Sequence, residues 1–211
     1  MTAVTIDPDS VLWSAPERER AGRPLLVLMH GYGSHEGDLF GLSPQLPLGP
    51  VVASVRAPTP EGGGFAWFPF GGQADAATRL AAADDAAAAM LEWLDTLEYT
   101  SVGLLGFSQG GAMALQLLRL APERFSFAVN LSGFALEGDH PGDESLRSVR
   151  PPVFWGRGTA DTMISDALIS ITDRWLPEHS TLTERIYEDL THSISQPELA
   201  DVSAFIREQL G

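Results

Sequence analysis

Two residue types are absent from the sequence, and each absence excludes a class of chemistry. The 211 residues contain no cysteine, which excludes disulfides, thiolate metal sites and a cysteine nucleophile. They contain no lysine either, so all 13 basic residues are arginine and Schiff-base chemistry on a lysine is excluded.

Positive charge and long apolar runs are also scarce. The 13 basic residues stand against 28 acidic ones, and the formal net charge is −15. This balance argues against nucleic acid as a partner and against stable association with an anionic membrane. No run approaches the roughly 18 apolar residues that cross a bilayer. The first ten residues, which include Asp7 and Asp9, lack the basic start and apolar stretch of a secretory signal, so we expect a cytoplasmic protein.

Length and patterning predict one α/β domain over residues 1–211, with a large core. Five short apolar runs suit parallel strands buried on both faces: 25–29, 51–55, 102–107, 127–131 and 153–155. Residues 182–187 alternate apolar and polar side chains, as a strand near a sheet edge does. Helical patterns cover 73–98, 110–120, 165–176 and a last segment opened by Pro197. This alternation predicts a mostly parallel sheet flanked by helices.

Two stretches, 56–72 and 132–152, show no regular pattern. Each follows a predicted strand, so both should lie at the carboxyl edge of the sheet, where folds of this class hold their sites.

The segment from Gly106 to Gly110 carries the strongest functional signal, because it reads G-x-S-x-G between an apolar strand and a helix. A serine on a sharp strand-to-helix turn has a strained backbone, and glycines two residues away avoid clashes. The turn exposes the Ser108 hydroxyl and points a helix N-terminus at a developing oxyanion. The alternative is a glycine-rich helix start with a solvated serine.

A serine nucleophile needs a base and an orienting carboxylate, which follow such a turn in the order acid, then histidine. Of the two late histidines, His192 follows the strand 182–187 on the side where Ser108 should emerge, whereas His179 precedes that strand. Asp161 lies in the loop after the strand 153–155, and Asp166 and Asp173 fall within the next helix. We therefore predict Ser108, Asp161 and His192 as a catalytic triad. An incidental surface histidine and an aspartate that only caps the helix are the alternatives.

Two backbone N–H groups are predicted to stabilise the oxyanion. One belongs to Gln109, directly after the serine, and the other to Tyr32, in the loop after the first central strand. Since both donate through the backbone, their side chains are expected to be dispensable. His30 is expected to support this loop. His35, Glu36 and Asp38 come close to a metal-like grouping, but a solvated loop is the preferred interpretation, and we predict no metal and no cofactor.

With these motifs the sequence resembles the phospholipase/carboxylesterase family of α/β-hydrolases, which includes bacterial carboxylesterases and acyl-protein thioesterases. The resemblance covers about residues 23–210 and rests on the segments 28–33, 106–111, 161–164 and His192. It implies an α/β-hydrolase fold, the same triad, and Tyr32 and Gln109 as oxyanion donors. The sequence departs from the family at Arg157, where a histidine is frequent, and at Thr191, where glycine is usual.

The substrate is predicted to be a small-molecule ester. Phe65, Trp67 and Phe70 beside a glycine hinge suit an acyl-binding wall, and the alternative is that Trp67 and Phe70 pack under their loop. Residues 132–152 are too few for a separate cap domain, so the site should be open. We predict a serine carboxylesterase for short to medium acyl esters, with no stable membrane association. An acyl thioesterase or lysophospholipase with the same triad, a non-catalytic ligand-binding domain, and a homodimer remain open.

Overall fold

The computed structural model describes residues 4–71 and 74–211. Its strands are β1 (Leu12–Trp13), β2 (Leu25–Met29), β3 (Val51–Val55), β4 (Thr59–Glu61), β5 (Gly64–Ala66), β6 (Val102–Phe107), β7 (Phe127–Leu131), β8 (Pro152–Gly158) and β9 (Thr181–Tyr187). Its α-helices are α1 (Gly37–Phe40), α2 (Ala76–Asp95), α3 (Gln109–Leu120), α4 (Asp143–Val149), α5 (Asp166–His179) and α6 (Gln196–Leu210). No helix among these is long and apolar enough to cross a membrane.

Seven of the described strands form one sheet in the order β1-β3-β2-β6-β7-β8-β9. Every neighbouring pair is parallel except β1 and β3. The five predicted apolar strands occupy the centre, and β9, the predicted strand with alternating side chains, lies at one edge. The predicted α/β fold with a mostly parallel sheet is confirmed. Because the parallel strands run the same way, the loops after β2, β6, β7, β8 and β9 meet at one edge of the sheet.

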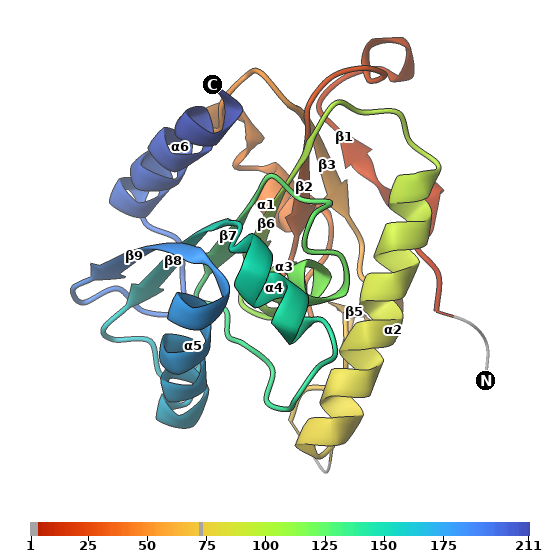
Figure 1. Cartoon of the computed structure of the whole chain (residues 1–211). Coiled ribbons are helices and arrows are strands. Elements are labelled where there is room, and N and C mark those ends of the chain that lie inside the picture. Colours follow the sequence, from red (N-terminus) through yellow and green to blue (C-terminus); the bar gives the residue numbers. More distant parts are fainter. Residues whose placement is uncertain (1–3, 72–73) are drawn as a thin grey trace.

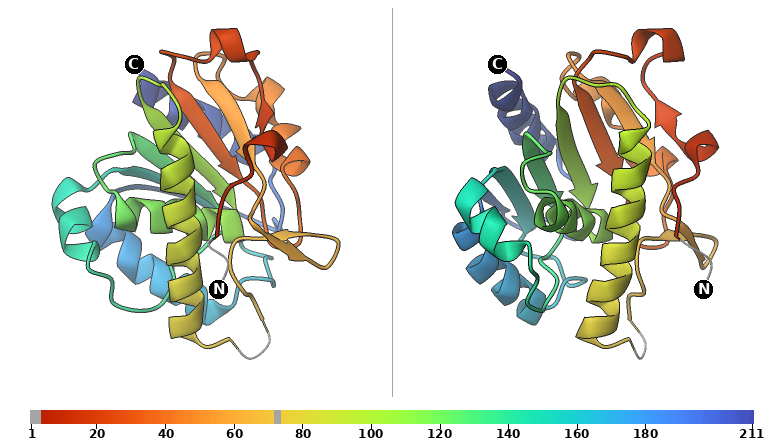
Figure 2. Two further views of the ribbon diagram at one scale, coloured as in Figure 1. Left: turned by 90° about the vertical axis from the view of Figure 1, so that its right-hand side faces the viewer. Right: turned by 45° about the vertical axis from the view of Figure 1, so that its right-hand side comes forward.

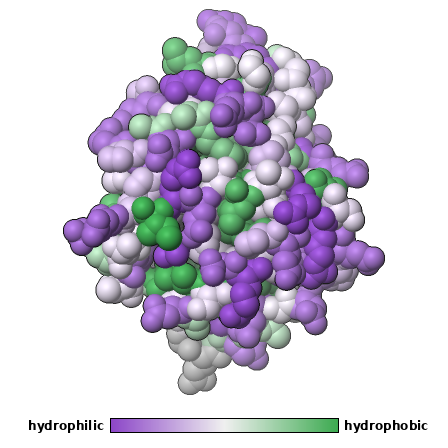
Figure 3. Space-filling model, turned by 60° about the vertical axis from the view of Figure 1, so that its left-hand side comes forward, coloured by the Kyte–Doolittle hydropathy of each residue, from purple (hydrophilic) through white to green (hydrophobic). Residues whose placement is uncertain are grey.

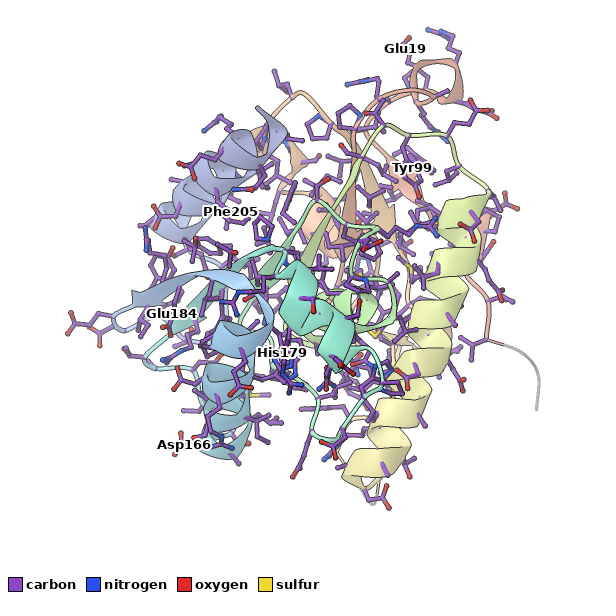
Figure 4. The ribbon with its side chains drawn as sticks, viewed as in Figure 1. Glu19, Tyr99, Asp166, His179, Glu184 and Phe205 are labelled. Atoms are coloured by element: carbon purple, nitrogen blue, oxygen red, sulfur yellow. The ribbon has the colours of Figure 1, made fainter. Side chains whose placement is uncertain are left out.

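Helices cover both faces of this sheet (Figure 1). Helices α2 to α5 contribute to the core on one face, here called the α3-side core, and Figure 2 shows α2 lying across that face. Helices α1 and α6 bury their apolar residues on the other face, in the α6-side core. There Phe205 projects from α6 towards the sheet (Figure 4), with its ring centroid 5.9 Å from that of Phe127 and 5.7 Å from that of Phe154.

The two stretches predicted to be irregular contain short regular elements, which is a correction. Residues 56–72 include the hairpin β4–β5, whose turn uses Gly62 and Gly63 at positive φ. The hairpin is also joined to the loop after β2, because Phe65 N donates to Ser34 O and Gly33 N donates to Phe65 O. Residues 132–152 include α4, whose first residue, Asp143, pairs with Arg119 of α3. Both elements depend on tertiary contacts that no local pattern contains.

Two helices differ from their predicted bounds by more than one residue. Gln73, the predicted start of the long helix, lies outside the described residues, and α2 begins after Asp75, whose side chain accepts from Thr78 N. Helix α5 continues through Pro177 to His179, beyond its predicted end at residue 176. The guanidinium of Arg150 donates to the carbonyls of Pro177, Glu178 and Ser180, which satisfies the acceptors that this last turn leaves free.

The start of α6 contains a buried carboxylic acid. Ser195 and Glu198 cap the helix reciprocally: Glu198 N donates to Ser195 Oγ, and Ser195 N donates to Glu198 Oε2. The side chain of Glu198 packs against Gly156 of β8, and its Oε1 has no hydrogen-bond partner among the described residues. Burial raises the pKa of Glu198 to about 7.

Glu198→Gln should therefore change how stability depends on pH. The native carboxyl keeps its proton up to about pH 7, whereas the unfolded one loses it near 4.5, so the wild type loses stability as pH rises through this window. Glutamine stays neutral. The free energy of unfolding of Glu198→Gln relative to that of the wild type should therefore rise by on the order of 3 kcal/mol between pH 4.5 and pH 8. Urea unfolding at several pH values measures the difference.

Glu208→Gln, on the exposed side of the same helix, is the matched control and should show no such trend. If the free energy of unfolding depended on pH in the same way for wild type and Glu198→Gln, Glu198 would be ionised in the native protein.

Candidate active site

Ser108 lies on the sharp turn between β6 and α3, in a backbone conformation with φ 55° and ψ −116°. A Cβ on Gly106 would overlap the carbonyl of Gly110, and a Cβ on Gly110 would overlap the carbonyl of Met29. Glycine is therefore required at both positions of the G-x-S-x-G segment. The turn holds Ser108 at the carboxyl edge of the sheet, at the start of a twelve-residue helix.

The three residues predicted as a triad are brought together at this edge. The loop after β8 carries Asp161 and the loop after β9 carries His192. Ser108 Oγ lies 2.9 Å from His192 Nε2, and His192 Nδ1 lies 2.7 Å from Asp161 Oδ2. Because a carboxylate only accepts hydrogen bonds, Nδ1 carries the proton, and Nε2 is free to accept from the serine hydroxyl. This arrangement can remove a proton from Ser108.

The alternative residues lie elsewhere. His179 ends α5, at the other end of β9, with its ring stacked 4.4 Å from that of Trp175. Asp166 and Asp173 lie within α5, as predicted. The cap of α5 is Ser165, so Asp161 does not cap that helix. Its Oδ1 instead accepts from Met163 N at 2.9 Å, which fixes the carboxylate while Oδ2 faces His192.

The two departures from the family pattern have partners of their own. Arg157 lies over the ring of Trp155 and pairs with Glu184 at 3.3 Å, within β8 and β9. Thr191 precedes His192, and its carbonyl accepts from Ser193 N at 2.7 Å. The hydrogen bonds between Ser108, His192 and Asp161 are formed with both residues present.

The loop after β2 is held by a chain of hydrogen bonds through His30. Ala57 N donates to His30 Nε2, so Nδ1 carries the proton and donates to Gly31 O at 2.8 Å. Burial lowers the pKa of His30, which favours this neutral form. Since the peptide between Gly31 and Tyr32 is trans and planar, holding its carbonyl also fixes the direction of the Tyr32 N–H. Gly31 itself lies against Ser108, because a Cβ there would be 3.4 Å from the serine Cβ.

The side chain of Gln109 makes contacts that the sequence did not indicate. It is buried, its Oε1 accepts from Trp67 N at 2.9 Å, and its Nε2 donates to Phe68 O at 2.6 Å. It thereby ties the first turn of α3 to the loop after β5. Removing it would leave two buried backbone groups without partners, at a cost of about 1–3 kcal/mol each. The Gln109 N–H lies in the first turn of α3, where backbone donors have no intrahelical acceptor.

The three predicted wall residues have different surroundings. Trp67 is only 2% exposed, and its Nε1 donates to His30 O, so it packs under the loop, as the alternative interpretation held. Phe65 is half-buried beneath the guanidinium of Arg56. Phe70 is also half-buried, with its ring 6.1 Å from that of Tyr32 and 5.5 Å from that of Phe134.

The metal-like grouping has other partners. His35 Nδ1 accepts from Gly37 N, Glu36 pairs with Arg56, and Asp38 accepts from Ser34 Oγ. Within residues 4–71 and 74–211, no group of three or more His, Asp or Glu side chains is arranged to hold a metal ion.

Sequence reasoning missed three features of this site. They are the Gln109 side-chain bonds, the ring of Phe134 next to Phe70, and a hollow beside His192 that is described below. Each joins residues more than 40 positions apart, and no spacing in the sequence signals such contacts.

Comparisons with known proteins agree with this fold. The sequence profile described as Phospholipase/Carboxylesterase matches residues 15–210. The solved structure of esterase PE8 is 28% identical and superposes with a TM-score of 0.75, covering 97% of this chain and 99% of that one. The predicted α/β-hydrolase fold is confirmed.

Two curated relatives match part of the chain. Acyl-protein thioesterase 1 of Candida albicans is 33% identical over 108 residues, which cover 48% of this chain and 47% of that protein. Carboxylesterase SOBER1 of Arabidopsis thaliana is 31% identical over 117 residues, which cover 52% of this chain and 49% of that protein. The chain thus spans about half the length of the curated relatives it matches.

Trp67→Phe tests whether Trp67 positions the site or contacts substrate. The variant keeps a large ring but loses the donor to His30 O, which leaves a buried acceptor unpaired. We expect kcat/KM on p-nitrophenyl esters to fall by a similar factor, about tenfold, for acetate, butyrate and hexanoate. A loss that grows with acyl length would show instead that the indole forms part of the acyl wall.

Proposed function

Because the chain belongs to the phospholipase/carboxylesterase family, we propose that it is a serine esterase that hydrolyses esters of short to medium acyl chains through an acyl-enzyme. The observation that carries the proposal is the continuous hydrogen-bond chain from Ser108 through His192 to Asp161. A serine hydroxyl becomes a nucleophile when a base accepts its proton and a carboxylate orients that base.

In the proposed acylation step, Ser108 Oγ attacks the ester carbonyl carbon while its proton passes to His192 Nε2. Asp161 holds the imidazole in the required tautomer and stabilises the imidazolium that forms. The proton then passes from Nε2 to the leaving oxygen, the carbon–oxygen bond breaks, and the alcohol departs. Water repeats the sequence on the acyl-enzyme and releases the carboxylic acid.

The negative charge on the carbonyl oxygen is proposed to be stabilised by the N–H groups of Tyr32 and Gln109. Two observations support this assignment. Gln109 begins α3, whose N-terminus carries a positive partial charge. The bond from His30 Nδ1 to Gly31 O fixes the Tyr32 peptide next to Ser108. Donors fixed in advance lower the barrier without reorganising during the reaction.

The acyl group is proposed to lie against an aromatic wall formed by Phe70 and Tyr32, beside Phe65, with the buried ring of Phe134 behind Phe70. Tyr32 is 40% exposed and Phe70 half-buried, so both present surface to a substrate, whereas Trp67 is buried. The wall is short, because the ring centroids of Tyr32 and Phe134 lie only 6.1 Å and 5.5 Å from that of Phe70. It suits acyl chains of a few carbons.

The character of the protein surface favours a substrate that is dissolved in water over one that is held in a bilayer. The face in Figure 3 is largely hydrophilic, with its hydrophobic side chains in separate patches. The large hydrophobic side chains exposed among the described residues come from six separate segments: Leu12, Tyr32, Leu48, Val149, Met163 and Ile186. A net charge of −15 also disfavours anionic lipid.

An acyl thioesterase is the second candidate, favoured by the acyl-protein thioesterase among the relatives. The same residues would act, since only the leaving atom changes from oxygen to sulfur.

Ser108→Ala tests the nucleophile. We expect kcat on p-nitrophenyl butyrate to fall by about 10⁴–10⁶, since triad members act as a unit. A fluorophosphonate reagent should label Ser108 in the wild type, as mass spectrometry of peptides would show. Ser145→Ala, at an exposed serine in α4, is the control and should keep full activity and labelling. Labelling at another residue would refute the assignment.

Acyl-chain length tests the wall. We expect kcat/KM on p-nitrophenyl esters to peak between butyrate and octanoate and to fall for longer chains, with no increase when substrate forms micelles. Phe70→Ala should lose activity on the preferred ester but little on acetate, because each buried CH₂ contributes about 0.8 kcal/mol. A rate that climbs to palmitate would contradict this and favour a long-chain thioesterase or lipase.

A further inference from the structure

A hollow of about 240 Å³ lies beside His192. Its apolar lining is Leu39 of α1, Leu42 just after α1, Phe107 at the end of β6, and Ile194. The remaining lining residues are Asp38, His192 and Ser193. We call this hollow the Leu42 pocket. No role in the reaction described above uses it.

The position of the pocket relative to the sheet separates it from the aromatic wall. Phe65, Phe70 and Phe134 belong to or pack against the α3-side core. Leu39, Leu42, Phe107 and Ile194 belong to or pack against the α6-side core, on the opposite face. Ser108 follows Phe107 at the carboxyl end of β6, between the two faces. An ester carbonyl bonded to Ser108 therefore has one substituent directed towards each side.

The histidine decides which substituent points towards the pocket. His192 Nε2 must first take the proton of Ser108 and then give it to the leaving oxygen, so that oxygen lies within hydrogen-bond reach of Nε2. His192, whose ring centroid lies 4.8 Å from that of Phe107, itself lines the pocket. The group attached to the leaving oxygen thus enters the pocket, and the acyl group lies on the side of Phe70.

The lining also determines the chemical class of this group. Four apolar side chains favour a hydrocarbon. Asp38 supplies a negative charge, and the protein as a whole carries −15, so an anionic group is repelled and a cationic one is tolerated.

We propose that the Leu42 pocket binds the uncharged, apolar alcohol portion of the substrate and, in the reverse direction, an alcohol that accepts the acyl group. This inference rests on the proposed function. In the transfer, the alcohol oxygen attacks the carbonyl carbon of the acyl-enzyme while its proton passes to His192 Nε2. The bond between that carbon and Ser108 Oγ then breaks, and the proton returns to Oγ. The products are a new ester and the free enzyme, so the protein is an acyltransferase to alcohols as well as a hydrolase.

The experiment uses p-nitrophenyl butyrate as donor and ethanol, butanol, hexanol or 4-hydroxybutyrate as acceptor, with the ratio of new ester to butyric acid measured by gas chromatography. The acyl-enzyme is the same in every reaction, so the ratio reports only the acceptor. At equal acceptor concentration, the ratio of new ester to butyric acid should rise about two- to fourfold for each CH₂ added to the alcohol, up to butanol. With 4-hydroxybutyrate it should lie below that with ethanol.

Three variants connect this preference to the pocket. Leu42→Trp fills it and should abolish the preference for butanol over ethanol, and the smaller change Ile194→Ala should weaken it. Asp38→Asn should raise transfer to 4-hydroxybutyrate relative to butanol several-fold. Leu48→Trp makes the same substitution at an exposed leucine outside the pocket and should leave all ratios unchanged.

Two failures can be told apart. If wild type shows a burst of p-nitrophenol but equal ratios for all alcohols, or if Leu42→Trp keeps the butanol preference, the pocket does not bind the alcohol and this inference is wrong. If no burst and no acyl-Ser108 form, the proposed function fails and this inference fails with it.

Discussion

The strained turn at Ser108 is the constraint on which the rest of the site depends. A positive φ at a serine is unfavourable, and the turn is possible only because Gly106 and Gly110 leave room for neighbouring carbonyls. β6 lies in the centre of the sheet, paired on both sides, and α3 packs against β6 and β7, so the backbone at the turn is held from every direction. The strain is therefore balanced by packing, and the hydroxyl stays at the sheet edge where the loops after β8 and β9 deliver Asp161 and His192.

Around this turn, buried hydrogen bonds make three loops into one unit. Gln109 ties α3 to the backbone at Trp67 and Phe68, Trp67 ties that segment to His30 O, and His30 holds the Gly31–Tyr32 peptide. Each bond is buried, so breaking one leaves a buried polar group without a partner, because water cannot replace the lost hydrogen bond. The two candidate oxyanion donors are in this way coupled through side chains that do not themselves face a substrate. A change at Trp67 or His30 should therefore act on the reaction rate more than on the choice of acyl group.

The sheet also separates two apolar surfaces that lie on either side of Ser108. Aromatic rings extend from the α3-side core on one side of Ser108, and the Leu42 pocket continues the α6-side core on the other. Neither side carries a cap domain in the described residues: the segment between β7 and β8 folds into the short helix α4 and is held by the buried pair of Arg119 and Asp143.

The sequence alone determined the class of fold, because apolar runs and helical periods of this length have few ways to bury themselves other than in a parallel sheet between helices. It also indicated Ser108, Asp161 and His192, since the turn requires glycines at fixed spacing and the acid and histidine follow particular strands. Local patterns did not contain the hairpin β4–β5, helix α4 or the last turn of α5, which depend on Phe65, Arg119 and Arg150 contacting distant backbone or side chains. The role of Trp67 was also decided by tertiary structure, because an indole beside a glycine hinge can face either substrate or core, and only the bond to His30 O shows which. The Leu42 pocket arises where α1, the end of β6 and the loop before α6 meet, and such a surface exists only once the chain has folded.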